Sequence, residues 1–173
     1  MGRLFSSMLC TYLLMLASAS LRAATLAEEP DVKAAFIYNF ALYTAWPKPS
    51  SDLKVCVMGE DSLLTSMKKF EGRSAHGSNL RIESVTSASE ARSCQILFIG
   101  TSEHEHIDQI NKALEDAPVL TVTDYGKLAS YSTVIVLLLR NDEHMTFEIN
   151  KSAATGKGLT LSSKLLRLAS KVR

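Results

Sequence analysis

The sequence has no marked excess of charge of either sign. Lysine and arginine number 19 in 173 residues, against 18 aspartates and glutamates. Leaving out residues 1–23, which hold Arg3 and Arg22, the balance is 17 to 18. No basic stripe stands out along the chain. Because nucleic-acid binding relies on clustered cations that neutralise phosphates, the sequence predicts no nucleic-acid partner.

Glycine-rich phosphate-binding loops are also missing. The turns after two apolar segments read MGEDSLL and IGTSEHE, with one glycine each, so neither a dinucleotide-binding fingerprint nor a Walker loop is present. Ser102 has no second flanking glycine to make a nucleophile elbow, and we expect it to cap a helix. The sequence therefore predicts no catalytic residue and no cofactor, and we expect the chain not to be an enzyme.

Metal-ligand and paired-acid patterns are weak. His104 and His106 are spaced His-x-His, but residues two apart diverge on a helix, so a solvated helix start is the better interpretation. Glu60 and Asp61 adjoin a helix start, where the macrodipole favours acids. We predict no metal site.

Long hydrophobic runs are limited to the amino terminus. Residues 1–23 contain one early cation, an apolar run and several alanines, which is the layout of a cleaved secretory signal, with cleavage after Ala19 or Ala23. The alternative is a retained anchor, but the apolar run is shorter than the roughly 20 residues that a span needs. The remainder, about 150 residues, is enough for one domain, which we place at residues 28–173.

Only three cysteines are present, and Cys10 lies in the expected signal. Cys56 and Cys94 remain. In an exported chain such a pair suggests a disulfide, which would close a loop worth about 4 kcal/mol in the chain-entropy model. The alternative is two small buried side chains on neighbouring strands.

The hydrophobic pattern alternates between strands and helices. Strands are predicted near LKVCVMG, LRIESV, CQILFIG and PVLTVTD, with a late hairpin of TVIVLLLR and MTFEIN. GRSAHGSN is expected to be a loop, and SSKLLRLASKV a closing helix capped by Ser162 or Ser163 with Leu165, Leu168 and Val172 on its inner side. This order predicts a three-layer α/β sandwich whose mixed, mostly parallel sheet has five or six strands.

The opening helix, predicted over Val32–Trp46, is apolar around most of its circumference. At about 22 Å it is too short to cross a bilayer. It must be covered by the domain's own core, by a partner, or by one on each face. Because aromatic residues are enriched in interface cores, the candidate partner-binding residues are Phe36, Tyr38, Tyr43 and Trp46.

The segments VKAAFIYNFALYTAWP, VCVMGED, CQILFIGTSE, VLTVTD, FEINKSAA and LTLSSKLLRLA occur in this order. Together they closely resemble the YfiR-like family of exported bacterial proteins, over about Val32 to Val172. The resemblance implies a periplasmic α/β protein that holds an inner-membrane diguanylate cyclase inactive by contact. It also implies release by an outer-membrane lipoprotein, a homodimer, and a role for disulfides, with Cys56 and Cys94 at matching positions.

The chain departs from some members in one respect. LASYSTVIVLLL lacks a second close cysteine pair, so redox control through that pair cannot operate. Two other functions stay open. One is a periplasmic carrier of a small ligand, bound at the strand ends near Gly59 and Gly100. The other is an accessory protein of a different membrane receptor or sensor kinase.

Overall fold

A computed structural model describes residues 28–126, 132–139 and 144–173. The predicted signal at residues 1–23 lies outside the described residues. No helix within the described ranges has the length and apolar character that crossing a bilayer would require. Within these described residues the main sheet has eight strands. Their order is β10 (Lys171–Val172), β8 (Met145–Ile149), β7 (Ile135–Leu139), β6 (Leu120–Thr123), β5 (Ile96–Ile99), β2 (Asp52–Met58), β4 (Ser78–Ser84) and β3 (Ser74–Ala75).

The centre of the sheet is parallel. β4, β2, β5, β6 and β7 run in one direction, and β8 returns antiparallel to β7 as the predicted hairpin. The predicted mixed, mostly parallel sheet is therefore confirmed. The count exceeds five or six because β3 and β10 add two-residue edges, which are too short to show a hydrophobic period.

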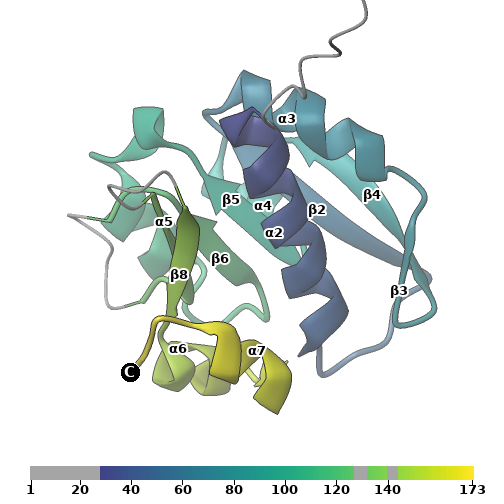
Figure 1. Ribbon diagram of the computed structural model, residues 1–173, viewed down its shortest axis with the longest axis vertical. Helices are drawn as coiled ribbons and strands as arrows, with labels where there is room; N and C mark the ends of the chain where they lie inside the picture. The colour runs from purple at the N-terminus through teal and green to yellow at the C-terminus, as the bar shows by residue number, and fades with distance from the viewer. Residues whose placement is uncertain (1–27, 127–131, 140–143) are drawn as a thin grey trace, which may run out of the picture.

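Alternate strand residues enter two separate cores. Val55 and Val57 of β2 belong to one cluster, and Cys56 and Met58 belong to the other. The first core lies under α2 (Glu29–Tyr43) and α3 (Asp61–Met67); the second lies under α4 (Ala88–Ala91) and α5 (Ile107–Ala113). Figure 1 shows α2 lying across one face of the sheet. Helices on both faces give the predicted three layers.

The opening helix is shorter than predicted at its carboxyl end. It ends at Tyr43, and Thr44–Ala45 form β1, which pairs with β9 (Thr160–Leu161). Apolar residues continue past Tyr43, at Ala45 and Trp46, so the hydrophobic pattern does not show where the helix stops. Trp46 therefore lies outside the helix.

The prediction that Ser102 caps a helix is wrong. Residues Thr101–Glu103 form a 3₁₀ turn, and α5 begins only at Ile107. The Ser102 hydroxyl instead donates a hydrogen bond to the Gly59 carbonyl oxygen at 2.8 Å. The loop predicted at GRSAHGSN is also more regular than expected, because β3 and β4 meet in a two-residue turn in which both His76 and Gly77 have positive φ.

The closing helix stops early. Ser162 caps α7 (Ser163–Leu168) as predicted, with its side chain accepting from the Leu165 amide. The chain then leaves the helix, because the Ser170 amide donates to the Phe147 carbonyl and β10 pairs with β8. Leu168 and Val172 are consequently 60% and 43% exposed, not on an inner face.

Candidate functional site

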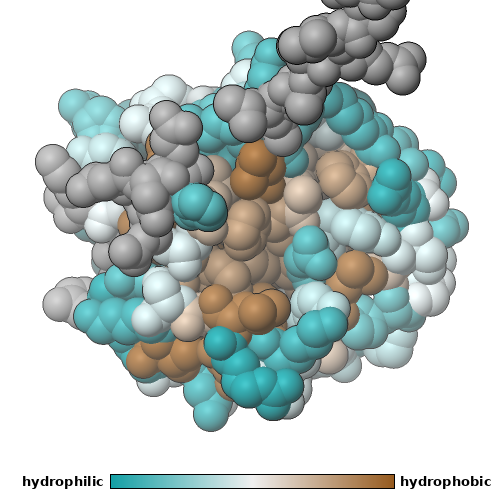
Figure 2. All heavy atoms as spheres, viewed as in Figure 1, coloured by the Kyte–Doolittle hydropathy of each residue, from teal (hydrophilic) through white to brown (hydrophobic). Residues whose placement is uncertain are grey.

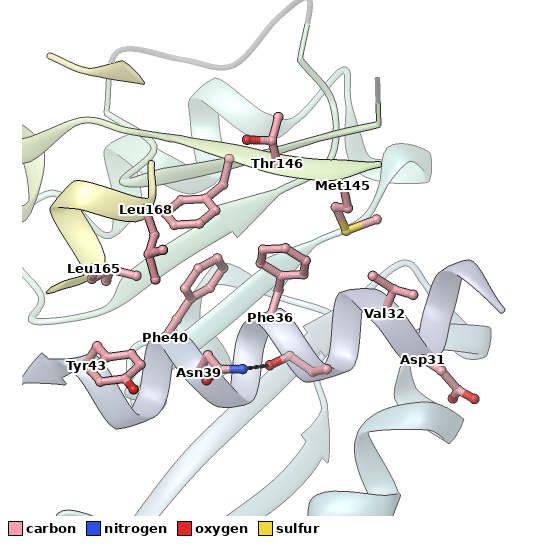
Figure 3. A pocket seen from close by; sticks show the side chains of 12 residues that line it. Asp31, Val32, Phe36, Asn39, Phe40, Tyr43, Met145, Thr146, Leu165 and Leu168 are labelled. Carbon is pink, nitrogen blue, oxygen red and sulfur yellow. Dashed lines mark hydrogen bonds between the residues drawn. The ribbon is translucent and has the colours of Figure 1, made fainter. Parts of the chain in front are cut away.

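An apolar groove runs along α2 on the side that faces β8 and α7. Its volume is about 540 Å³. Figure 3 shows α2 on one side of it, β8 on the other and α7 at one end. We call this feature the α2 groove; it is lined by Asp31, Val32, Ala35, Phe36, Asn39, Phe40, Tyr43, Met145, Thr146, Phe147, Leu165 and Leu168.

Three phenylalanines form the base of the α2 groove. The Phe147 ring packs edge-on against Phe40 at 5.1 Å and against Phe36 at 5.8 Å between centroids. Figure 3 shows Phe36 and Phe40 pointing from α2 toward β8. Phe40 and Phe147 are buried, whereas Phe36 is partly exposed. The base is therefore a packed aromatic cluster in which Phe36 is the ring that solvent or a partner can reach.

Ion pairing at Lys33 holds the amino-terminal end of α2 against the sheet. Lys33 is 5% exposed, and its Nζ lies 2.5 Å from Asp124 Oδ2, 2.9 Å from Glu29 Oε1 and 3.8 Å from Glu60 Oε1. Glu60 and Asp124 follow β2 and β6, so the cluster joins the helix to the carboxyl ends of two strands. A buried ammonium needs partners of opposite charge. The three carboxylates therefore explain how a lysine can be buried at position 33 of a mostly apolar helix.

These contacts also set the charge state of Lys33. Burial by itself lowers the pKa of the ammonium, but hydrogen bonds to Asp124 and Glu29 outweigh that effect and raise the pKa of Lys33 above its ordinary 10.5. Lys33 is therefore a permanent cation at neutral pH.

The other end of α2 is held by β1 and α7. Thr44 and Ala45 pair with Leu161 and Thr160, and the Ser162 amide donates to the Tyr43 carbonyl at 2.9 Å. Lys164 of α7 donates to the Tyr43 hydroxyl at 2.7 Å. These bonds place α7 beside α2 and so close one end of the α2 groove.

The α2 groove belongs to a wider apolar surface. Figure 2 shows hydrophobic residues gathered along α2 and toward α7, with hydrophilic residues around them. Leu168 is 60% exposed, and the large apolar side chains that are exposed among the described residues are Leu139, Leu168 and Val172. A contiguous apolar surface with a polar border is typical of a protein-contact site.

The structure brings two of the four predicted partner-binding residues together. Phe36 and Tyr43 both line the α2 groove. Tyr38 lies elsewhere on α2, with its ring 5.0 Å from Phe70. Trp46 lies in a separate cavity of about 390 Å³, where its Nε1 donates to the Gln95 carbonyl at 3.1 Å. A role in partner binding stays a prediction for all four.

The sequence did not predict the wall of the α2 groove that faces α2. Met145, Phe147, Leu165 and Leu168 lie more than a hundred residues after α2 in the chain, and their own elements give an ordinary core pattern. No local signal distinguishes them from buried residues. Only the pairing of β1 with β9 and of β7 with β8 brings them to α2.

The strand ends near Gly59 and Gly100, where a ligand crevice was considered, are packed against each other. A Cβ on Gly100 would lie 2.7 Å from the Gly59 carbonyl oxygen. Gly59 has φ +74°, and its carbonyl accepts the Ser102 hydroxyl. These glycines are thus explained by close backbone approach.

The histidine pair takes part in local contacts. His104 Nδ1 lies 3.0 Å from the Thr101 carbonyl oxygen, and His106 Nδ1 lies 3.6 Å from Glu103 Oε2. Within the described part of the chain, no group of three or more histidine, cysteine or acidic side chains is arranged to hold a metal ion.

Cys56 and Cys94 form a disulfide, with Cα atoms 6.1 Å apart. Both residues are buried, in the core beneath α4 and α5. The bond ties the central strand β2 to the segment that enters β5. It lies on the opposite face of the sheet from the α2 groove.

The comparisons with known proteins agree with this fold. A family model described as YfiR/HmsC-like matches residues 30–170. Among solved structures, a conserved domain protein from Vibrio cholerae O1 biovar eltor str. N16961 matches with 13% identity and a TM-score of 0.56, covering 84% of this chain and 60% of that one. At that identity the likeness concerns the fold alone.

A second solved structure is described as the ABC domain in complex with L-Trp from Streptococcus pneumonia. It matches with 10% identity and a TM-score of 0.49, covering 70% of this chain and 55% of that one. That score is too low to support an argument. The chain thus spans between 55% and 60% of the length of these two solved proteins.

Proposed function

This chain belongs to the YfiR/HmsC-like family, and from that premise we propose that it is a periplasmic regulatory protein of diguanylate cyclase signalling. It represses a membrane-bound cyclase by protein–protein contact. The family match extends over residues 30–170, which is nearly all of the described chain, and it is the observation that carries the proposal.

The α2 groove supports contact as the mode of action. It offers a partly exposed aromatic base and a half-buried methionine, and apolar surfaces of this kind fit an apolar segment of another protein. A periplasmic segment of the cyclase occupies the groove in the repressed state. An outer-membrane lipoprotein relieves repression by binding this protein at the same groove, because two partners cannot occupy one groove at once.

Export through a cleaved signal at residues 1–23 brings the domain to the periplasm. The family resemblance further implies that the domain acts as a homodimer. Export and dimerisation both belong to the proposal, and light scattering measures dimerisation.

The test is made in the source bacterium. Deleting the gene should raise the cellular level of cyclic di-GMP, because the cyclase loses its repressor, and restoring the gene should lower it again. An unchanged nucleotide level after deletion would contradict regulation of a cyclase and would favour another membrane receptor or a sensor kinase as the partner.

A matched pair of variants tests the groove itself. Leu139 and Met145 are paired across the β7–β8 hairpin, but only Met145 lines the α2 groove. Met145→Asp should abolish repression, because a carboxylate would be desolvated against the partner. Leu139→Asp, at a side chain already 58% exposed, should repress normally. Thermal melting of both variants shows whether they remain folded, and normal repression by a folded Met145→Asp would reject the groove.

A second candidate function is a small-ligand carrier. The groove volume of about 540 Å³ is within the range of small-molecule sites, and its lining is mainly apolar. A ligand that fills it should raise the melting temperature of the wild-type protein by mass action, and this rise should be lost in Met145→Asp. Screening of metabolite mixtures without any shift would count against this function.

A further inference from the structure

Charge is divided unevenly along the chain, although the total is balanced. Residues 151–173 contain no aspartate or glutamate, while all 18 acidic residues of the sequence come before them. The near-neutral sum conceals this division, and a count along the sequence reveals it. The cations of this last segment are Lys151, Lys157, Lys164, Arg167, Lys171 and Arg173.

Two of these cations are already engaged. Lys157 is buried, and its ammonium donates to the Leu114 carbonyl at the end of α5. Arg173 forms an ion pair with Glu148 at 2.5 Å. Neither is free to attract another molecule.

The remaining four are exposed on the elements that end the chain. Lys151 begins α6 (Lys151–Gly156), Lys164 and Arg167 lie on α7, and Lys171 lies on β10. Figure 1 shows α6, α7 and the carboxyl terminus together at one extremity of the molecule. Among the described residues none of the four has a carboxylate within ion-pair distance. The Lys164 ammonium is engaged by the Tyr43 hydroxyl and ring, which leaves Lys151, Arg167 and Lys171 free to attract another molecule. We call this surface the basic end.

Apolar side chains project from the same elements. Leu168 of α7 is 60% exposed, and Val172 of β10 is 43% exposed. An isolated exposed apolar side chain needs no explanation, and Leu168 also lines the α2 groove. Val172 lies outside the groove and follows the exposed Lys171. Cations combined with projecting apolar side chains are the pattern by which proteins bind at a membrane interface.

We propose that the basic end is a docking surface for a lipid bilayer that carries anionic phospholipid headgroups. Lys151, Arg167 and Lys171 attract the headgroups, while Val172 enters the boundary between headgroups and acyl chains. The cations do not line the α2 groove; they come from three elements at the extremity of the fold, which fits a broad surface better than a single peptide. The net negative charge of the rest of the chain orients this end toward the membrane.

The proposal does not depend on the proposed function. It would place the domain on a membrane surface whatever protein it contacts there, with the α2 groove still open at its side. Each cation near an anionic surface should contribute about fivefold to affinity, so the three free cations give weak, reversible binding.

The experiment uses the exported protein and sedimentation with vesicles. Vesicles of phosphatidylcholine alone are compared with vesicles that also contain phosphatidylglycerol. The protein should sediment with the second kind only, and binding should be lost in about 1 M salt, where the Debye length is about 3 Å. No sedimentation with phosphatidylglycerol vesicles at low salt would overturn the proposal.

Charge-reversal variants locate the surface. Arg167→Glu and Lys171→Glu should each weaken vesicle binding by about 25-fold, since each removes an attraction and adds a repulsion of similar size. Lys112→Glu, at an exposed cation of α5 outside the basic end, should bind like wild type. Equal binding by all three would place the lipid contact elsewhere and reject the basic end.

Two further arms separate the alternatives. Binding of soluble polyglutamate without binding to anionic vesicles would reject the membrane and favour an acidic protein. Met145→Asp, which disrupts the α2 groove, should still bind vesicles. Failure of the lipid proposal and failure of the groove proposal are therefore distinguishable.

Discussion

Lys33 is the side chain on which the position of α2 depends most. Its ammonium is surrounded by Glu29, Glu60 and Asp124, and Asp124 is 13% exposed. The sequence pattern shows only a lysine that interrupts an apolar helix, because its partner Asp124 lies 91 residues further along the chain. The cluster carries more negative than positive charge, so it tolerates the loss of a carboxylate better than the loss of the lysine.

Replacing Lys33 by methionine should lower the free energy of unfolding by about 3–5 kcal/mol, because nearly buried carboxylates lose their cation. The matched control is Lys69→Met. The Lys69 ammonium also pairs with a carboxylate, that of Asp31 at 2.5 Å, but its side chain is 60% exposed. Solvent screens that pair, so the control should lose much less. Urea unfolding measures both, and equal losses would show that the Lys33 cluster is not a structural anchor.

The carboxyl pKa values predict how stability depends on pH. Hydrogen bonds from Lys69 and Ser66 lower the pKa of Asp31 below its ordinary 3.8, and a hydrogen bond from Arg92 lowers the pKa of Asp116. Groups with a lowered folded pKa stabilise the protein above the unfolded value, and that contribution is lost as pH falls through the folded value. Stability should therefore decline below about pH 3.8.

At alkaline pH the dependence is reversed, and stability falls as the pH rises. The raised pKa of Lys33 means that its contribution is complete below 10.5 and is lost as pH rises above that value. Urea midpoints across the pH range test both limits. The double variant Asp31→Asn/Asp116→Asn should show a shallower acid decline than wild type, and an identical decline would assign the acid sensitivity to other groups.

Among the elements, α2 shows how far pattern reasoning reached. Its apolar circumference predicted a helix that needs cover on several sides, and Ala34, Ile37 and Ala41 are indeed buried. Another side of α2 lines the α2 groove and is only partly covered. The helix end was misplaced because Thr44 and Ala45 join β9, a pairing more than a hundred residues away.

The disulfide links two other elements, β2 and the segment before β5. Replacing Cys56 and Cys94 together by alanine should lower the free energy of unfolding by about 2–4 kcal/mol, because the unfolded chain regains the freedom of a loop closed across 38 residues. The urea unfolding midpoint measures the loss. Reducing agent should shift wild type toward the variant and leave the variant unchanged.

This variant also separates stability from function. The bond lies on the sheet face opposite the α2 groove, so a folded double variant should still repress cyclic di-GMP synthesis. Loss of repression by a folded variant would show that the disulfide influences the groove across the sheet.

For the whole molecule, the assembly state is the property to measure. The family resemblance implies a homodimer. Light scattering of the exported protein should give twice the mass of the residue 24–173 chain. A monomer at all accessible concentrations would contradict the dimer.

The sequence by itself determined the layered α/β class, the alternation of strands and helices, the late hairpin and the family. These features depend on local periodicity and on ordered segments, which any chain displays one residue after another. It also pointed to the aromatic character of α2, including Phe36 and Tyr43.

Only the tertiary structure decided which surface those residues form. The opposite wall of the α2 groove comes from β8 and α7, the anchor of α2 comes from Asp124, and the basic end gathers α6, α7 and β10. Each depends on contacts between segments far apart in the chain, and sheet order, which fixes those contacts, leaves no mark in local periodicity.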